Sequence, residues 1–572
     1  MNWWRHACIT RSRQYKGTVA PDLVRGPSFF AARRCKIGPI HCIGLTLVGR
    51  RARFANSPPR PRTKSGATAA GINYLLSPLA ACALAVFLAA CSSTPNQPAT
   101  ALSQIDTIVV IYAENRSFDH LFGHFPGAEG IDSATAEQKT QLDRDGTPLR
   151  VLPPVYKDRK PHDDFPGDLP NGPFAADRAP GWRSISATDP DPTHSFYQHI
   201  AQINGGRNNM FVAHSNAGAL PMATFDGSTL KMWQWAKAYT LADHFFQSAY
   251  GGSFINHQRL ICACVPRQPD APDSIRAVVD AHGRLAQSEN SPASVMSGPP
   301  RYVRDGRVGP VSAGSYALNS NQPAYQPSEY LPPKGDFTRT DPARFPLTPL
   351  TAKTIGDTLS AKGISWAWYA QGWEAAQADG MRDPALKRVV INVTGDESSP
   401  NFQPHHQPFN YYARFAPGRA DRATHLRDRK DLIAAARAGT LPQVSFYKPS
   451  GLHSQHSGSS TIAAGDAEID EILTRLAASP QWPRMAIIVT YDEYGGYWDH
   501  MPPPSGPGWS DDFGPGTRIP AIIVSPLAKR GYVDRTVYDT TSIQKLLNVR
   551  FGLEPLPGLR EKMGDLTGAF GF

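Results

Sequence analysis

Cysteine is scarce in this chain: there are seven in 572 residues, and five of them lie at or before residue 91. Only Cys262 and Cys264, in the stretch RLICACV, belong to the rest of the chain. A body this long can bury a large core without disulfides. Because cysteines two positions apart rarely pair with each other, we expect Cys262 and Cys264 to be packed as thiols.

Excess positive charge is absent from most of the chain, although the formal total is +10. Residues 1–70 hold fourteen Lys or Arg and one acid, Asp22, so that subtracting their +13 leaves residues 71–572 at about −3. The body therefore lacks the basic stripe that nucleic-acid binding requires, and we predict no nucleic-acid partner.

Several enzyme motifs are also missing. The sequence contains no G-x-x-x-x-G-K-[ST] and no H-E-x-x-H, which argues against P-loop nucleotide binding and zincin chemistry. The stretch GGSFI (251–255) lacks the last glycine of the lipase pattern G-x-S-x-G. CVPRQ (264–268) approaches the sulfatase pattern C-x-P-x-R, but Arg267 falls one residue early, which disfavours a sulfatase.

One long apolar run, YLLSPLAACALAVFLAAC, ends at Cys91 and is typical of a secretory signal. Leu88-Ala89-Ala90-Cys91 resembles the bacterial lipobox, in which the cysteine is lipidated. We therefore expect a lipoprotein signal peptide over 71–91, a flexible tether over 92–104, and export to the periplasm or outer membrane through lipidated Cys91, with or without later release. A transmembrane anchor is the alternative. Residues 1–70 are a basic extension, unstructured or a misplaced translation start.

Short, β-branched, near-continuously apolar segments predict strands that are covered on both faces. They lie at 106–112, 443–447, 485–491 and 520–526. Helical patterns occur at 229–246, 353–363, 431–439, 466–479 and 540–552. This alternation predicts an α/β fold with a central, mostly parallel β-sheet flanked by helices. Two pattern-poor regions, about 125–190 and 266–350, predict long loop or cap insertions, and a separate small domain over 266–350 is an alternative.

Polar side chains follow three of these strands. Glu114 and Asn115 follow the first, Asp492 and Glu493 follow the third, and a segment with two histidines follows 443–447. Ligands bind beyond the carboxyl ends of the strands in open α/β sheets. Oxygen ligands favour Ca²⁺ or Mg²⁺, with Zn²⁺ as a further possibility. The alternative is that each acid caps a helix or pairs with an arginine.

A nucleophile candidate is Ser253, in the stretch YGGSFINHQRLICAC. A tight Gly-Gly turn precedes it and a helical pattern follows, so Ser253 is expected at a helix N-terminus, among free backbone N–H groups that favour an anion. A divalent cation nearby would activate the serine oxygen and stabilise charge on a transferring phosphoryl group. The alternative is a serine that only caps its helix.

Several stretches together resemble the bacterial phosphoesterase family of acid phosphatases and non-specific phospholipases C. They run in family order and are ENRSFDHLFG, DPTHSFYQ, GGSFINH, HHQPFNYY, KPSGLHSQH, TYDEYGGYWDHMPPP and GYVDRTVYDTTSIQKLLNVRFGLEPLPG. The resemblance implies an alkaline-phosphatase-like α/β fold and one catalytic domain over 105–572.

The resemblance also implies residue roles. The metal ligands would be Glu114, Asn115, Asp492, Glu493 and Ser253. The catalytic residues would be Ser253 as nucleophile and the histidines His194, His456 and His406 near the phosphate, with His405 and His453 as competitors for the last two roles. The family motif containing Asp499 and His500 implies no specific role for them, and Arg535 stands where a histidine is common.

The function implied is a metal-dependent phosphoester hydrolase, an acid phosphatase that acts on phosphomonoesters through a phosphoserine intermediate. A histidine that works in its protonated form would favour acidic pH. Two alternatives stay open: a phospholipase C that releases diacylglycerol from phospholipids, and a non-catalytic surface lipoprotein that binds metal or phosphorylated ligands.

Overall fold

A computed structural model describes residues 101–178, 183–304, 309–396 and 398–572. The predicted extension 1–70, the signal segment 71–91 and most of the tether lie outside these residues. No helix in the described part of the chain is long and apolar enough to cross a membrane. The described residues from 101 onward fall in one compact unit. A separate small domain over 266–350 stays an alternative.

The centre of the fold is an eight-stranded sheet. In spatial order its strands are β13 (Tyr532–Asp534), β6 (Thr240–Ala242), β12 (Ala521–Val524), β11 (Met485–Tyr491), β1 (Thr107–Ala113), β10 (Val444–Lys448), β8 (Trp366–Ala370) and β9 (Leu426–Arg427). Only β12 runs antiparallel to its neighbours, β11 and β6. Every residue of β1 and β11 is buried, as expected for apolar strands covered on both faces.

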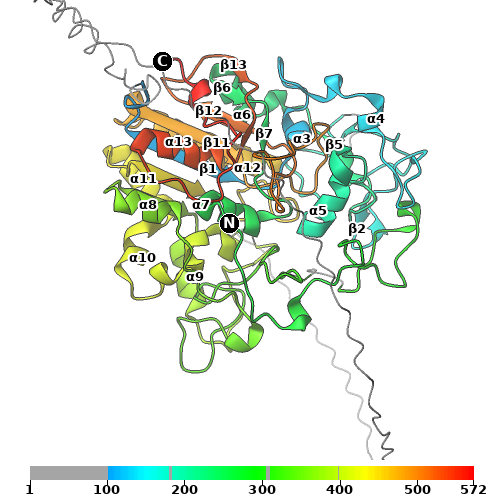
Figure 1. Cartoon of the computed structure of the whole chain (residues 1–572), viewed down its shortest axis with the longest axis horizontal. Coiled ribbons are helices and arrows are strands. Elements are labelled where there is room, and N and C mark those ends of the chain that lie inside the picture. Colours follow the sequence, from blue (N-terminus) through cyan, green and yellow to red (C-terminus); the bar gives the residue numbers. More distant parts are fainter. Residues whose placement is uncertain (1–100, 179–182, 305–308, 397) are drawn as a thin grey trace, which may run out of the picture. The chain divides into compact units, whose positions relative to one another are not determined.

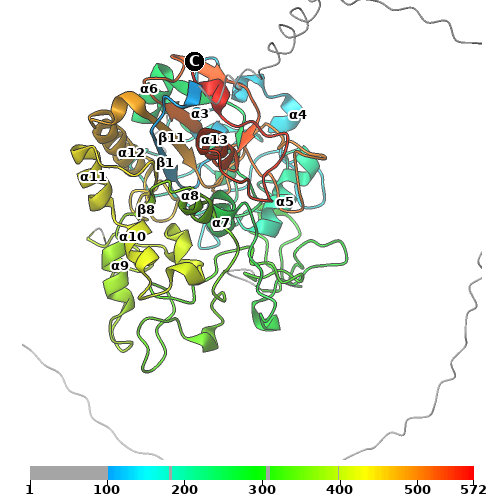
Figure 2. The same ribbon diagram turned by 60° about the vertical axis from the view of Figure 1, so that its left-hand side comes forward.

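Helices cover both faces of this sheet. Figure 2 shows α6, α11 and α12 on one side, and α7, α8 and α13 on the other. The α-helices of the described residues are α3 (Phe118–Phe122), α4 (Ala136–Lys139), α5 (Phe196–Ile203), α6 (Lys231–Ala238), α7 (Ser253–Cys262), α8 (Ile355–Ala361), α9 (Trp373–Gly380), α10 (Ala420–His425), α11 (Arg429–Ala438), α12 (Ile462–Ala477) and α13 (Ser542–Phe551). The predicted α/β class with a mostly parallel sheet is confirmed.

One predicted helix is wrong in its second half. The pattern at 229–246 gives α6 only as far as Ala238, because Tyr239 leaves the helical conformation and the chain continues as strand β6. β6 is hydrogen-bonded to β12 and β13. The three residues of β6, Thr240–Ala242, are all buried, and their pairing in the sheet overrides the helical periodicity.

The two pattern-poor regions contain only short elements. Around 125–190 these include α4 and the two-residue strands β2 (Tyr156–Lys157), β3 (Lys160–Pro161) and β4 (Phe174–Ala175), which pairs with β5 (Ala223–Thr224). In Figure 1 this cyan segment lies to one side of the sheet. A further short pair, β7 (Phe245–Phe246) and β14 (Tyr538–Asp539), forms a separate two-stranded parallel sheet.

Cys262 and Cys264 form a disulfide, which corrects the expectation of two packed thiols. Helix α7 ends at Cys262, and Ala263 takes a left-handed conformation with φ of 49°. This residue turns the chain back on itself, so that the two Cα atoms lie 5.0 Å apart. That separation is within the usual range for a disulfide, even though the cysteines are only two positions apart.

Candidate active site

The pairing register of β1 and β11 places the C-terminal ends of these two central strands side by side at the same edge of the sheet. β1 and β11 are parallel, and Ala113 is the partner of Tyr491. Glu114 and Asp492 are therefore the first residues beyond the sheet on neighbouring strands. Asn115 follows in a left-handed conformation with φ of 63°, which asparagine tolerates better than most residues. Its backbone N–H donates to Asp492 Oδ1 at 3.2 Å, which ties the two strand ends together.

The predicted carboxylates converge with oxygens that lack hydrogen-bond partners. Glu114, Asp492 and Glu493 are fully buried. Oxygens Glu114 Oε2, Asp492 Oδ2 and Glu493 Oε1 have no hydrogen-bond donor in the described part of the chain. Buried polar atoms are normally satisfied, and buried like charges repel each other. This donor set fits a hard divalent cation, which would supply the missing partner for each oxygen.

Burial and the repulsion between neighbouring carboxylates also shift the pKa values of these acids. Burial raises the pKa of Glu493 well above its usual range, and the neighbouring Asp492 charge adds to the effect. The pKa of Asp492 is likewise raised, by burial first. Glu114 differs: burial would raise its pKa, but the His406 and Lys448 contacts hold it well below the usual range.

Ser253 joins this cluster from helix α7. It is the first residue of the helix, while Gly252 holds the capping position without a side-chain bond. Ser253 is therefore not the cap of its helix. Its Oγ donates to Asn115 Oδ1 at 3.4 Å, and only 5% of the residue is exposed. The preceding Gly251, at φ of 89°, makes the turn that delivers the serine to the carboxylates.

The Gly-Gly pair of TYDEYGGYWDH allows the site loops to pack closely. Both glycines have positive φ. A Cβ on Gly495 would lie 2.2 Å from the Asn115 carbonyl oxygen, and one on Gly496 would lie 2.9 Å from the Thr193 carbonyl oxygen. The turn therefore presses against Asn115 on one side and against the loop that carries His194 on the other.

Two predicted histidines lie together at the more exposed side of the site. The rings of His194 and His456 have centroids 5.6 Å apart. His194 donates from Nδ1 to the Pro192 carbonyl at 2.7 Å, which leaves its Nε2 3.6 Å from Glu493 Oε1. Asp191 Oδ1 lies 3.6 Å from His194 and 4.0 Å from His456. Burial lowers the pKa of His456, but Asp191 and the site carboxylates outweigh it, and the net pKa is raised.

The third predicted histidine lies on the buried side. His406 Nε2 contacts Glu114 Oε1, and His405 Nε2 lies 3.7 Å from the same oxygen. Burial lowers the pKa of His406 to about 3, against the opposing effect of Glu114, so this imidazole is neutral. Of the competing pair, His406 thus makes the closer contact. In the segment after β10, the other competitor, His453, bonds to Ser450 instead.

Two further side chains belong to the site and were not predicted. Lys448, the last residue of β10, is fully buried with its Nζ 2.9 Å from Glu114 Oε1. His257 lies one turn beyond Ser253 on α7, donates from Nδ1 to the Ser253 carbonyl at 2.7 Å, and keeps Nε2 without a partner. His257 could have been predicted from the sequence, because a residue four positions after Ser253 lies on the same face of a helix. Lys448 could have been predicted because it closes an apolar strand that ends at the site.

Asp499 and His500 contribute to a separate buried cluster. Arg518 lies between three carboxylates, with its nitrogens 3.0 Å from Asp119, 3.1 Å from Asp499 and 3.3 Å from Asp243. His500 Nδ1 donates to Asp119 Oδ2 at 2.7 Å. These charges satisfy one another, so the cluster ties the ENRSFDH segment to the YWDH segment and has a structural role.

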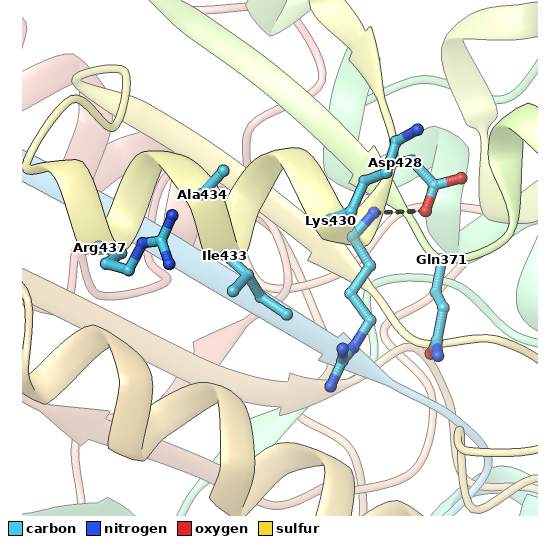
Figure 3. Close-up of a pocket in the computed structure, with 7 residues that line it drawn as sticks. Gln371, Asp428, Lys430, Ile433, Ala434 and Arg437 are labelled. Carbon is cyan, nitrogen blue, oxygen red and sulfur yellow. Dashed lines mark hydrogen bonds between the residues drawn. The ribbon is translucent and has the colours of Figure 1, made fainter.

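A cavity elsewhere on the surface contains none of the predicted site residues. It has a volume of about 400 Å³ and lies at the start of α11 (Figure 3). The carboxylate of Asp428 there accepts a bond from the Arg429 backbone and caps the helix. Arg429 and Lys430 are paired with glutamates. Asp428, Arg429 and Lys430 of this cavity are thus engaged in structural contacts.

The comparisons with known proteins agree with this site. The model of the Phosphoesterase family matches residues 105–554, and the chain belongs to that family. The predicted family is confirmed, and this membership supports an enzyme that hydrolyses phosphoester bonds over the non-catalytic alternative.

The relatives include several phospholipases C. A non-hemolytic phospholipase C of Pseudomonas aeruginosa is 25% identical over 506 residues, which cover 82% of this chain and 58% of that protein. Phospholipase C B of Mycobacterium tuberculosis is 23% identical over 507 residues, 82% of this chain and 78% of that protein. Non-specific phospholipase C1 of Arabidopsis thaliana is 37% identical over 452 residues, 75% of this chain and 62% of that protein. The chain thus spans less than two thirds of the first and third relatives.

Among solved structures, a protein of the alkaline phosphatase superfamily from Vibrio parahaemolyticus aligns with 67% of this chain and 72% of its own. The TM-score is 0.29 and the identity is 9%.

Proposed function

We propose that this phosphoester hydrolase is an acid phosphatase that cleaves phosphomonoesters through a phosphoserine on Ser253. The observation that carries the proposal is the position of the Ser253 hydroxyl, which bonds to Asn115 beside three buried carboxylates with unsatisfied oxygens. A divalent ion held by Glu114, Asn115, Asp492, Glu493 and Ser253 would supply Lewis-acid activation of the serine and phosphoryl oxygens.

The chain's own residues would divide the chemistry as follows. Ser253 loses its hydroxyl proton to solvent and its Oγ attacks phosphorus, so that a new O–P bond forms and the bond to the leaving oxygen breaks; the serine oxygen regains a proton from solvent when the phosphoserine is hydrolysed. Protonated His456 donates its proton to that leaving oxygen. His194, directed to Glu493, holds a nonbridging oxygen of the phosphoryl group. In the second step His456 takes a proton from water, which attacks the phosphoserine and releases phosphate.

The assignment to phosphomonoesters rests on access. Ser253 is only 5% exposed, and a small phosphomonoester reaches such an enclosed hydroxyl more readily than the headgroup of a phospholipid in a bilayer does. Phospholipase C activity is the second candidate, because the relatives described above bear that name. It uses the same first displacement with diacylglycerol as the leaving group.

The test is turnover of p-nitrophenyl phosphate and phosphatidylcholine, measured in parallel with the purified full chain and with Ser253→Ala. We expect the monoester to be hydrolysed faster by the parent and neither substrate by the variant. Faster release of diacylglycerol would replace the phosphatase assignment by phospholipase C.

We further propose that the protein is exported and attached to a membrane through lipidated Cys91. The support is the lipobox-like Leu88-Ala89-Ala90-Cys91 at the end of the apolar run. Labelling of bacterial cells that make the chain with a radioactive fatty acid tests this proposal. The parent should incorporate label and Cys91→Ser should not; equal labelling of both would refute it.

A further inference from the structure

A lysine ammonium lies inside the carboxylate cluster. Lys448 is fully buried, and its Nζ lies 2.9 Å from Glu114 Oε1 and 3.7 Å from Asp492 Oδ2. The same nitrogen donates to the Ala113 carbonyl at 3.3 Å and lies 5.2 Å from the centre of the Tyr112 ring. The strand register fixes this position, because β10 and β1 are adjacent and parallel. Lys448 thus bridges the two acids that end β1 and β11.

The charges around this point balance with one divalent ion. With a divalent ion bound, the three buried carboxylates of Glu114, Asp492 and Glu493 would contribute three negative charges. The Lys448 ammonium and one divalent cation would contribute three positive charges. A second divalent cation would leave an excess of two positive charges in a buried site, which low-dielectric surroundings strongly disfavour.

The side chains around the ammonium nevertheless include donors suited to a metal. The ligand atoms of Glu114, His405 and His406 lie within 4.8 Å of one another, and so do those of Glu114, His257 and Asp492. Nitrogens His257 Nε2, His405 Nε2 and His406 Nδ1 are buried without hydrogen-bond partners in the described part of the chain. Neutral imidazoles beside carboxylates form a typical zinc-type donor set.

We propose that the Lys448 ammonium occupies the place of a second metal ion and so restricts the active site to one divalent cation. Glu114 and Asp492 would otherwise be shared between an oxygen-rich ion beside Ser253 and a nitrogen-rich ion beside His257 and His406. This inference rests on the proposed metal centre, but it concerns how many ions that centre holds. Lys448 is accordingly a residue that determines metal stoichiometry.

The experiment counts metal in Lys448→Met, which removes the charge and keeps an unbranched apolar stem. Lys545→Met is the matched control, because Lys545 is a partly buried lysine whose Nζ donates to the carbonyls of Glu561 and Met563. Each full chain is incubated with excess Zn²⁺, freed of unbound metal by gel filtration, and analysed by elemental mass spectrometry. Zinc sites elsewhere on the protein are common to all samples and cancel in the difference.

We expect Lys448→Met to retain about one zinc ion more per chain than the parent, and Lys545→Met to match the parent. A folded Lys448→Met with the parent's zinc content, or less, would overturn the proposal. Circular dichroism on heating establishes that each variant unfolds cooperatively.

A second measurement uses the parent and does not depend on the folding of Lys448→Met. The double variant Glu114→Gln, Asp492→Asn removes both shared acids. The parent should hold about one zinc ion more than this variant, and a difference of two ions would overturn the proposal. Because no substrate is involved, these counts stand whether or not the phosphatase assignment survives; an inactive parent with unchanged counts would affect that assignment alone.

Discussion

The Ser253 hydroxyl donates a hydrogen bond to the Asn115 side chain at 3.4 Å, although 138 residues separate them in the chain. One residue begins helix α7 and the other follows strand β1 in a left-handed conformation. The bond joins the reactive hydroxyl to the carboxylate cluster, because the Asn115 backbone is itself bonded to Asp492. Serine, amide and acids thus form one continuous unit.

Removal of the nucleophile gives the first prediction. Ser253→Ala should lower kcat on p-nitrophenyl phosphate by at least about a thousandfold, since the covalent route is lost. The fold should persist, because Ser253 does not cap α7. Steady-state kinetics and a thermal melt measure the two effects. Retention of full activity would mean that Ser253 is not the nucleophile.

The Gly-Gly turn gives the second prediction. Gly495→Ala places a Cβ 2.2 Å from the Asn115 carbonyl oxygen at φ of 67°, so both a clash and backbone strain arise. We expect a loss of about 3 kcal/mol or more in the free energy of unfolding. Gly506→Ala is the control, because its φ of 98° imposes strain while no atom lies within 4 Å of the added Cβ. It should cost only about 1–2 kcal/mol. Equal losses in urea unfolding would contradict the close packing.

The pH dependence gives the third prediction. The pKa of His456 is raised above 6.5, with Asp191 as the largest effect opposing burial. The protonated, proton-donating form is present below that pKa and is lost as pH rises through it, so activity should fall on the alkaline side. Asp191→Asn removes the stabilising charge and should move this alkaline limb to lower pH. The pH–rate profiles of both proteins test this. A limb that stays in place would exclude the role of Asp191, and an alkaline optimum in the parent would exclude the acid role of His456.

The buried Arg518 cluster gives the fourth prediction. Arg518→Met leaves three buried aspartates, Asp119, Asp243 and Asp499, without their common cation. Loss of one partner from a buried ion cluster costs about 3–5 kcal/mol. Lys353→Met breaks an exposed pair with Glu554 and should cost less than about 1 kcal/mol. Chemical unfolding of the three proteins measures both effects; a nearly neutral Arg518→Met would show that the aspartates find other partners.

The convergence of the acids could be predicted from the sequence because it follows from local signals. Apolar strands identify the sheet, and the carboxyl ends of parallel strands share one edge, which places Glu114 beside Asp492. Ser253 was a candidate from its local pattern, a Gly-Gly turn before a helix, and it does begin α7. The place of His194 in the site came from the family resemblance, since strand and helix patterns carry no information on where a loop folds back.

Other features depend on tertiary contacts that no local pattern reveals. Lys448 closes an apolar strand, but its full burial follows from the position of β10 between β1 and β8. The strand β6 was predicted as helix from its periodicity. The prediction failed because pairing with β12 outweighs that local pattern. The bond between Cys262 and Cys264 depends on a left-handed Ala263, a conformation that alanine rarely adopts.

That disulfide has a consequence for where the protein can mature. Thiols of this kind stay reduced in the cytosol and oxidise in the periplasm or outside the cell. The bond lies at the C-terminal end of α7, the ten-residue helix that begins at Ser253. The candidate nucleophile and the first cysteine of the disulfide are therefore the two ends of one helix. The proposed export would carry this pair of cysteines into a compartment where such a bond forms and persists.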